Sequence, residues 1–258
     1  MGLVSGLAER LLRKKNIYKF NGNLITLGAQ SILLTPYSLK RIINQEKIKI
    51  KPSLINKLDL LEKTKKFISR NEFFKLCGAE TIKSLDVSGY QNADILFDLN
   101  DDILPKNLQE TADFIFDGST IEHIFNIKNV MLNLNKILKK NGFIFHLSPL
   151  EGLSHDGFYQ FGTCFFPETY QNNRYKIVSH EVFVFDYENK IFNDEFFYKE
   201  GKNWFFSDLK EGIEFSRKHN LPAQHLFLAQ KQSNDLSFEI PYQGRYFNNS
   251  KWKKNLKV

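Results

Sequence analysis

Several short apolar runs in this sequence are followed by residues that could contact a ligand. Gly28-Ala29-Gln30 follows Leu24–Leu27, Asp86 lies in the next run, and Asp98 closes the one after that. In an open parallel sheet, ligands bind at the carboxyl ends of the strands. A glycine there lets the backbone approach a ligand. An acid at position 86 can accept both hydroxyls of a ribose, and one at position 98 can accept the amino group of adenine. The pattern predicts a site for an adenosyl group.

The sequence lacks the motifs that would bind a nucleotide phosphate chain or a metal ion. The chain has no P-loop lysine and no complete G-x-G-x-x-G, so nothing here is built to hold a pyrophosphate or triphosphate. Its two cysteines, Cys77 and Cys164, lie in no C-x-x-C and no Cys/His cluster, so we expect neither a disulfide framework nor a metal site. A reduced, cytoplasmic protein is the expectation from this cysteine usage.

The apolar runs that position these residues alternate with segments whose apolar residues have the spacing of a helix. Strands are expected at residues 24–27, 84–87, 93–98, 114–118 and 143–147, with a helix over 129–140 that ends at Asn141-Gly142. Later strands at 182–186 and 226–229 flank a helix at 207–219. Strand, helix, strand at this spacing predicts βαβ units and a mainly parallel sheet. His146, inside an apolar strand, is expected to be a buried and hydrogen-bonded histidine.

The order of these predicted elements also indicates the domain organisation. We expect one α/β domain over residues 1–258, with a helical insertion at about 38–75 after the first strand. Residues from about 170 to 258 should complete the sheet and add decorations and a basic tail. The chain has 42% hydrophobic and 25% charged residues and no apolar run long enough to span a membrane. Its net charge of +7 reflects abundant lysine, which fits solvated faces, so a nucleic-acid partner is not expected.

Four ordered segments resemble the motifs of class I S-adenosylmethionine-dependent methyltransferases. They are Ser84–Asp86, Asp98–Asn100, Phe116–His123 and Leu138–Phe143, within a match over about residues 20 to 165. Asp156–Phe161 and Pro241–Tyr246 are similar to a bacterial subgroup associated with capsule and surface-polysaccharide biosynthesis. The resemblance implies a Rossmann-like fold with a mainly parallel seven-stranded sheet and helices on both faces. It also implies S-adenosylmethionine as donor, S-adenosylhomocysteine as product and a small-molecule or sugar-type acceptor.

The resemblance also assigns residues to the cofactor site. It places Asp86 on the ribose and Asp98 on the adenine, and the full cofactor set is Gly28, Gln30, Asp86, Asp98, Leu99, Asp117 and Gly118. The glycine-rich loop is reduced to Leu27–Gln30, without the acid and further glycines of the family. Residue 86 also lies 58 positions after residue 28, whereas a dinucleotide-binding unit places its acid about 20 residues on. The helical insertion accounts for that difference.

Methyl transfer from a sulfonium is an in-line displacement, so the residues must mainly align the reactants and exclude water. No metal is required. A hydroxyl acceptor needs a general base, and histidine suits because its ordinary pKa is near 6.5. We expect His155, in the loop after the fifth strand, to be that base, with His123 as the second candidate. Tyr159, Gln160 and Glu122 are the expected acceptor-binding neighbours.

Two other function classes stay open at this point. The reduced glycine loop also fits a catalytically silent binding subunit with a methyltransferase fold, and the positive charge fits a nucleic-acid or protein methyltransferase. The signature Asn/Asp-Pro-Pro-aromatic of amide methylation is missing, since Asp117 is followed by Gly118-Ser119-Thr120. The sequence does not specify the acceptor or the oligomeric state.

Overall fold

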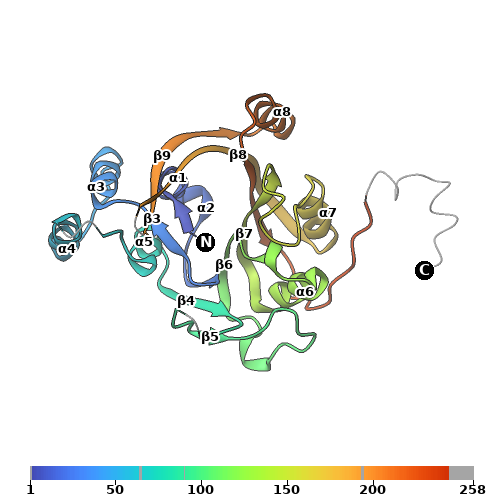
Figure 1. The fold of residues 1–258 in the computed structure, drawn as a ribbon. Helices are drawn as coiled ribbons and strands as arrows, with labels where there is room; N and C mark the ends of the chain where they lie inside the picture. Colours follow the sequence, from blue (N-terminus) through green and yellow to red (C-terminus); the bar gives the residue numbers. More distant parts are fainter. Residues whose placement is uncertain (1, 64–65, 90, 193–194, 244–258) are drawn as a thin grey trace, which may run out of the picture.

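The computed structural model describes residues 2–63, 66–89, 91–192 and 195–243, which fold around one mixed β-sheet (Figure 1). Across the sheet the strands run in the order β5 (Ile95–Leu96), β4 (Thr81–Asp86), β2 (Asn23–Leu27), β6 (Ala112–Gly118), β7 (Leu138–Glu151), β10 (Ala223–Lys231), β8 (Tyr175–Phe192) and β9 (Glu195–Phe206). From β5 to β7 all neighbours are parallel, whereas β10 is antiparallel to β7 and β8, and β9 to β8. This confirms the predicted α/β class and the mainly parallel, Rossmann-like sheet.

The predicted number of seven strands is wrong, because the described residues form eight in this sheet. The difference lies in β8, which extends from Tyr175 to Phe192 and is followed by its hairpin partner β9. The sequence prediction recognised only residues 182–186 of this hairpin. A separate two-stranded parallel sheet, β1 (Gly2–Val4) with β3 (Ser31–Leu33), was also not predicted.

Helices lie on both faces of the sheet (Figure 1). Alternation along β6 sends Phe114 and Phe116 into one core and Ile115 into the other. The first core takes side chains from α1 (Ser5–Arg13), α3 (Pro36–Gln45) and α5 (Arg70–Cys77). The second takes them from α6 (Ile127–Ile137) and α7 (Phe165–Asn172). The remaining helices are α2 (Lys15–Tyr18), α4 (Pro52–Lys63), α8 (Leu209–His219) and the 3₁₀ turns η1 (Lys106–Leu108) and η2 (Ile121–His123).

The segment predicted as a helical insertion contains α3, α4 and α5. Thr35 caps α3, with Pro36 at its start, and Ser69 with Glu72 forms a capping box on α5. The helices α3 and α5 bury side chains in the first core, whereas α4 buries only Leu58 and lies outermost in Figure 1. The side chains that α3 and α5 bury in the first core therefore anchor this segment.

The helix expected over residues 129–140 is shorter at its end than predicted. It stops at Ile137, and Leu138 is already extended and pairs with Ala112. Lys139 then lies on a strand, where its ammonium contacts Asp113 at 2.9 Å. Leu138 therefore belongs to a strand because it pairs with Ala112, although its position also fits the spacing of the preceding helix. The basic tail, and the Gly244–Tyr246 part of the late motif, lie outside the described residues.

Candidate functional site

Three parallel strands, β4, β2 and β6, end side by side at the carboxyl edge of the sheet, and we call the place where Gly28, Asp86 and Gln30 meet there the crevice. Gly28 follows β2 with a φ of +69° and donates its N–H to the Leu85 carbonyl at 2.8 Å. A Cβ on Gly28 would lie 3.6 Å from Thr120 Oγ1 and 3.8 Å from Asp86 Oδ2. The strand order reverses here, since β2 lies between β4 and β6, and such switch points are where open α/β sheets bind ligands.

Gln30 lies in a slot beside this glycine. Its amide Nε2 donates to the Leu27 carbonyl at 2.7 Å, and its side chain is buried. Its Oε1 has no hydrogen-bond partner among the described residues. A Cβ on Gly118 would lie only 2.4 Å from that Oε1, so a side chain at position 118 would displace the Gln30 amide from this slot. An unpaired buried acceptor is costly, which marks Oε1 as a position for a donor from a ligand.

The two predicted strand-end acids have different surroundings. Asp86 Oδ1 accepts hydrogen bonds from the backbone N–H and hydroxyl of Ser88 at 3.0 and 3.3 Å, and Oδ2 lies on the side of Gly28. Asp98 Oδ1 accepts from the backbone and side-chain nitrogens of Asn100 at 2.8 and 2.9 Å. The Leu99 side chain is buried in the second core. Of these two acids, Asp86 is the one whose carboxylate lies beside Gly28.

Asp117, expected at the cofactor, has a fully buried carboxylate. Its Oδ2 lies 2.7 Å from His146 Nδ1, and its Oδ1 accepts the Thr120 N–H at 3.0 Å. His146 Nε2 in turn lies 2.6 Å from the Tyr170 hydroxyl. The prediction that His146 is a buried, hydrogen-bonded histidine is confirmed. The carboxylate of Asp117 is therefore part of an interior hydrogen-bond chain, which the strand-end position did not reveal.

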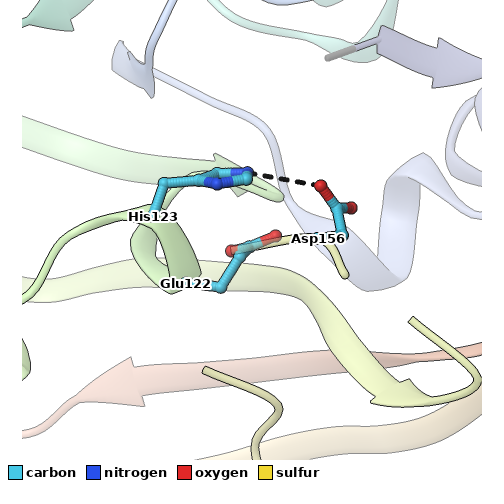
Figure 2. A group of neighbouring side chains, drawn as sticks. All are labelled: Glu122, His123 and Asp156. Carbon is cyan, nitrogen blue, oxygen red and sulfur yellow. Dashed lines mark ion pairs between the residues drawn. The ribbon is translucent and has the colours of Figure 1, made fainter. Parts of the chain in front are cut away.

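A second polar group lies at the same edge of the sheet, after β6 and β7. Figure 2 shows Glu122 and His123, from η2, pointing toward Asp156 in the loop that follows β7. His123 Nε2 is 3.7 Å from Asp156 Oδ1. Burial, together with the negative charges of Asp117 and Asp156, raises the pKa of Glu122 to about 8, although the hydrogen bond from the Ser119 hydroxyl lowers it. Asp156 was not predicted as a site residue, although it is adjacent to His155.

The other predicted acceptor residues lie in the same loop. Tyr159 is half-buried and donates its hydroxyl to the Phe125 carbonyl at 2.5 Å, whereas His155 and Gln160 are exposed. The backbone N–H groups of Phe158 and Tyr159 both donate to the Glu122 carbonyl. Phe125 and Phe158 expose 72% and 66% of their surface and meet edge to face. The structure thus brings together the loop and η2, with apolar rings open to solvent beside them.

Two cavities lie away from both groups. One of about 670 Å³ is lined by residues of β2 and β4, among them Asn23 and Lys83, and one of about 650 Å³ lies near Lys19 and Cys77. Neither is lined by the strand-end residues described above. Among the described helices, none is both long and apolar enough to cross a membrane.

The comparisons with known proteins gave structural neighbours only, because no family model and no curated protein matches the chain. A protein named MccD is 13% identical, with a TM-score of 0.43 over 89% of this chain and 99% of that one. A SAM-dependent methyltransferase from Archaeoglobus fulgidus is 10% identical, with a TM-score of 0.44 over 87% and 92%. A geranyl diphosphate methyltransferase in complex with SAM is 9% identical, with a TM-score of 0.42 over 89% and 85%.

Proposed function

We propose that the protein is an S-adenosylmethionine-dependent methyltransferase that methylates a hydroxyl group of a small-molecule or sugar-type acceptor. The observation that carries the proposal is the close approach of Gly28, Asp86 and Gln30 at the carboxyl ends of β2, β4 and β6. The ordered sequence motifs that resemble this enzyme class, and the strand order of the sheet, add support.

The residues of the crevice fit the donor. Gly28, at a φ of +69°, lets the backbone approach a ligand, and the Asp86 carboxylate can accept two ribose hydroxyls. The unpaired Gln30 Oε1 suits the ammonium group of the methionine part. Asp98, from the loop before η1, is proposed to accept the adenine amino group, and Leu99, Asp117 and Gly118 would contribute backbone contacts. The donor supplies a methyl group already activated on a sulfonium.

The acceptor is proposed to lie against the loop of residues 152–161. The exposed rings of Phe125 and Phe158 offer apolar faces to a sugar or other small ring, and Gln160 offers an exposed amide beside them. His155 is exposed in this loop, and we assign it the removal of the hydroxyl proton. We also propose that the protein belongs to the bacterial methyltransferase subgroup associated with capsule and surface-polysaccharide biosynthesis.

Calorimetric titration with S-adenosylmethionine tests the donor site. We expect the wild-type protein to bind, and Asp86→Ala to bind about tenfold to a hundredfold more weakly, because a charge-assisted contact contributes about 1.5–3 kcal/mol. Asp102→Ala removes an exposed acid outside the crevice and serves as the matched control, with unchanged affinity. A folded Asp86→Ala variant with wild-type affinity would overturn the assignment.

A further inference from the structure

Three side chains of metal-ligand type point toward one another at the end of β6 and in the loop after β7 (Figure 2). Glu122, His123 and Asp156 each place one ligand atom within 4.8 Å of the others, and His123 Nε2 is 3.7 Å from Asp156 Oδ1. Ligand atoms about 2.0–2.2 Å from a shared ion lie about 3–4 Å from one another. Small side-chain adjustments would therefore bring all three atoms around one ion.

Glu122 gives independent reason for a cation at this place. The residue is fully buried, and its Oε1 accepts the Ser119 hydroxyl. Its Oε2 has no hydrogen-bond partner among the described residues. A buried carboxylate oxygen without a donor is costly, and the neighbouring carboxylates of Asp117 and Asp156 add negative charge. Asp117 Oδ2 has its own partner in His146, whereas Glu122 Oε2 has none among the described residues.

Backbone hydrogen bonds hold the two elements, η2 and the loop that follows β7, against each other. The N–H groups of Phe158 and Tyr159 donate to the Glu122 carbonyl at 2.8 and 3.2 Å. Gly157, with a φ of +97°, allows this approach, because a Cβ there would lie 2.8 Å from the same carbonyl oxygen. The loop that carries Asp156 is thus fixed against η2. The side chains of His123 and Asp156 are 43% and 22% exposed, which leaves a path from solvent.

We propose that Glu122, His123 and Asp156 bind one divalent transition-metal ion of the Zn²⁺ or Mn²⁺ type. One imidazole nitrogen and two carboxylate oxygens are the mixed ligand set that such ions accept. The two carboxylates balance the charge of the ion, and the Ser119 hydroxyl orients Glu122 from outside the ligand set. Three protein ligands leave coordination positions open to water or to a substrate oxygen. A role of the ion in orienting the acceptor hydroxyl rests on the proposed methyl transfer, whereas the binding itself does not.

Calorimetry on chelator-treated full-length protein tests the site, with Zn²⁺ and Mn²⁺ titrated in separate experiments. We expect one ion per chain for at least one of the two metals, and a thermal midpoint that rises with metal concentration. His123→Gln and Asp156→Asn should each weaken binding at least about tenfold. His155→Gln changes the adjacent exposed histidine and should keep wild-type metal affinity.

Two results would overturn the proposal. One is the absence of both binding and thermal stabilisation up to millimolar Zn²⁺ and Mn²⁺ in folded wild-type protein. The other is one-site binding that His123→Gln and Asp156→Asn leave unchanged, which would place the ion elsewhere. Circular dichroism checks that each variant is folded, and both changed side chains are partly exposed. S-adenosylmethionine titrated into the same metal-free protein separates this proposal from the donor site, because either can fail while the other holds.

Discussion

Removal of the Asp117 carboxylate should destabilise the protein strongly. The carboxylate is fully buried and accepts two hydrogen bonds, from His146 and from the Thr120 N–H, at 2.7 and 3.0 Å. Asp117→Ala leaves both groups without their acceptor inside the protein. Each lost hydrogen bond to a charged group is worth about 1.5–3 kcal/mol. We therefore expect the free energy of unfolding to fall by about 3–5 kcal/mol, within the range for a broken buried pair.

Urea denaturation followed by circular dichroism measures this loss, and the thermal midpoint should fall by about 6–20 °C in a chain of this size. Glu214→Ala is the matched control, since it removes an acid from an exposed helical pair with Lys210 and should change stability by about 0.5 kcal/mol or less. If Asp117→Ala unfolds within about 1 kcal/mol of wild type, the buried hydrogen-bond chain is not the main role of this side chain.

Three further outcomes are expected. Burial lowers the pKa of His180 to about 3 and of His225 to about 4, so the unfolded chain, with histidines near pKa 6.5, binds more protons between pH 6.5 and about 4. The free energy of unfolding should fall as the pH falls through that window, and identical slopes for wild type and His180→Gln in urea titrations would contradict this. Gly28→Ala should cost about 1–2 kcal/mol in stability because of its φ of +69°, and should weaken S-adenosylmethionine binding at least about tenfold because the new Cβ enters the crevice. Gly89→Ala, whose Cβ would meet nothing within 4 Å, is its control, and equal ligand affinity of the two variants would argue against the crevice. His155→Ala should keep its affinity for S-adenosylmethionine but should turn over about a hundredfold more slowly. Turnover is measured as release of S-adenosylhomocysteine with a hydroxyl acceptor that the wild type methylates. A loss under about threefold would show that His155 is not the base.

The sequence predicted the central strands, and the turn residues and acids at their carboxyl ends, because both depend on local patterns. Apolar runs with turn residues after them mark β2, β4 and β6, and parallel pairing then brings Gly28 near Asp86. Asp86 and Asp117 look alike in the sequence, since each lies at the end of such a run. Their difference comes from His146, which lies on the neighbouring strand and pairs with only one of them.

Long-range pairing also explains the other differences. Leu138 continues the helical spacing of α6, yet it pairs with Ala112 as part of β7. The group of Glu122, His123 and Asp156 joins η2 to a loop 33 residues later in the chain, through backbone hydrogen bonds that no local pattern encodes. Glu122 and His123 had expected roles from the sequence, whereas Asp156 stood out only as the first residue of the motif Asp156–Phe161 and as the neighbour of His155.

A crystal structure of the protein with S-adenosylhomocysteine would show whether the donor binds at the ends of β2, β4 and β6. We expect ligand density in the crevice between Gly28 and Gly118, with the ribose hydroxyls within hydrogen-bond distance of the Asp86 carboxylate and the ammonium group near Gln30 Oε1. Ligand bound at another place, or an empty crevice in crystals saturated with S-adenosylhomocysteine, would contradict it.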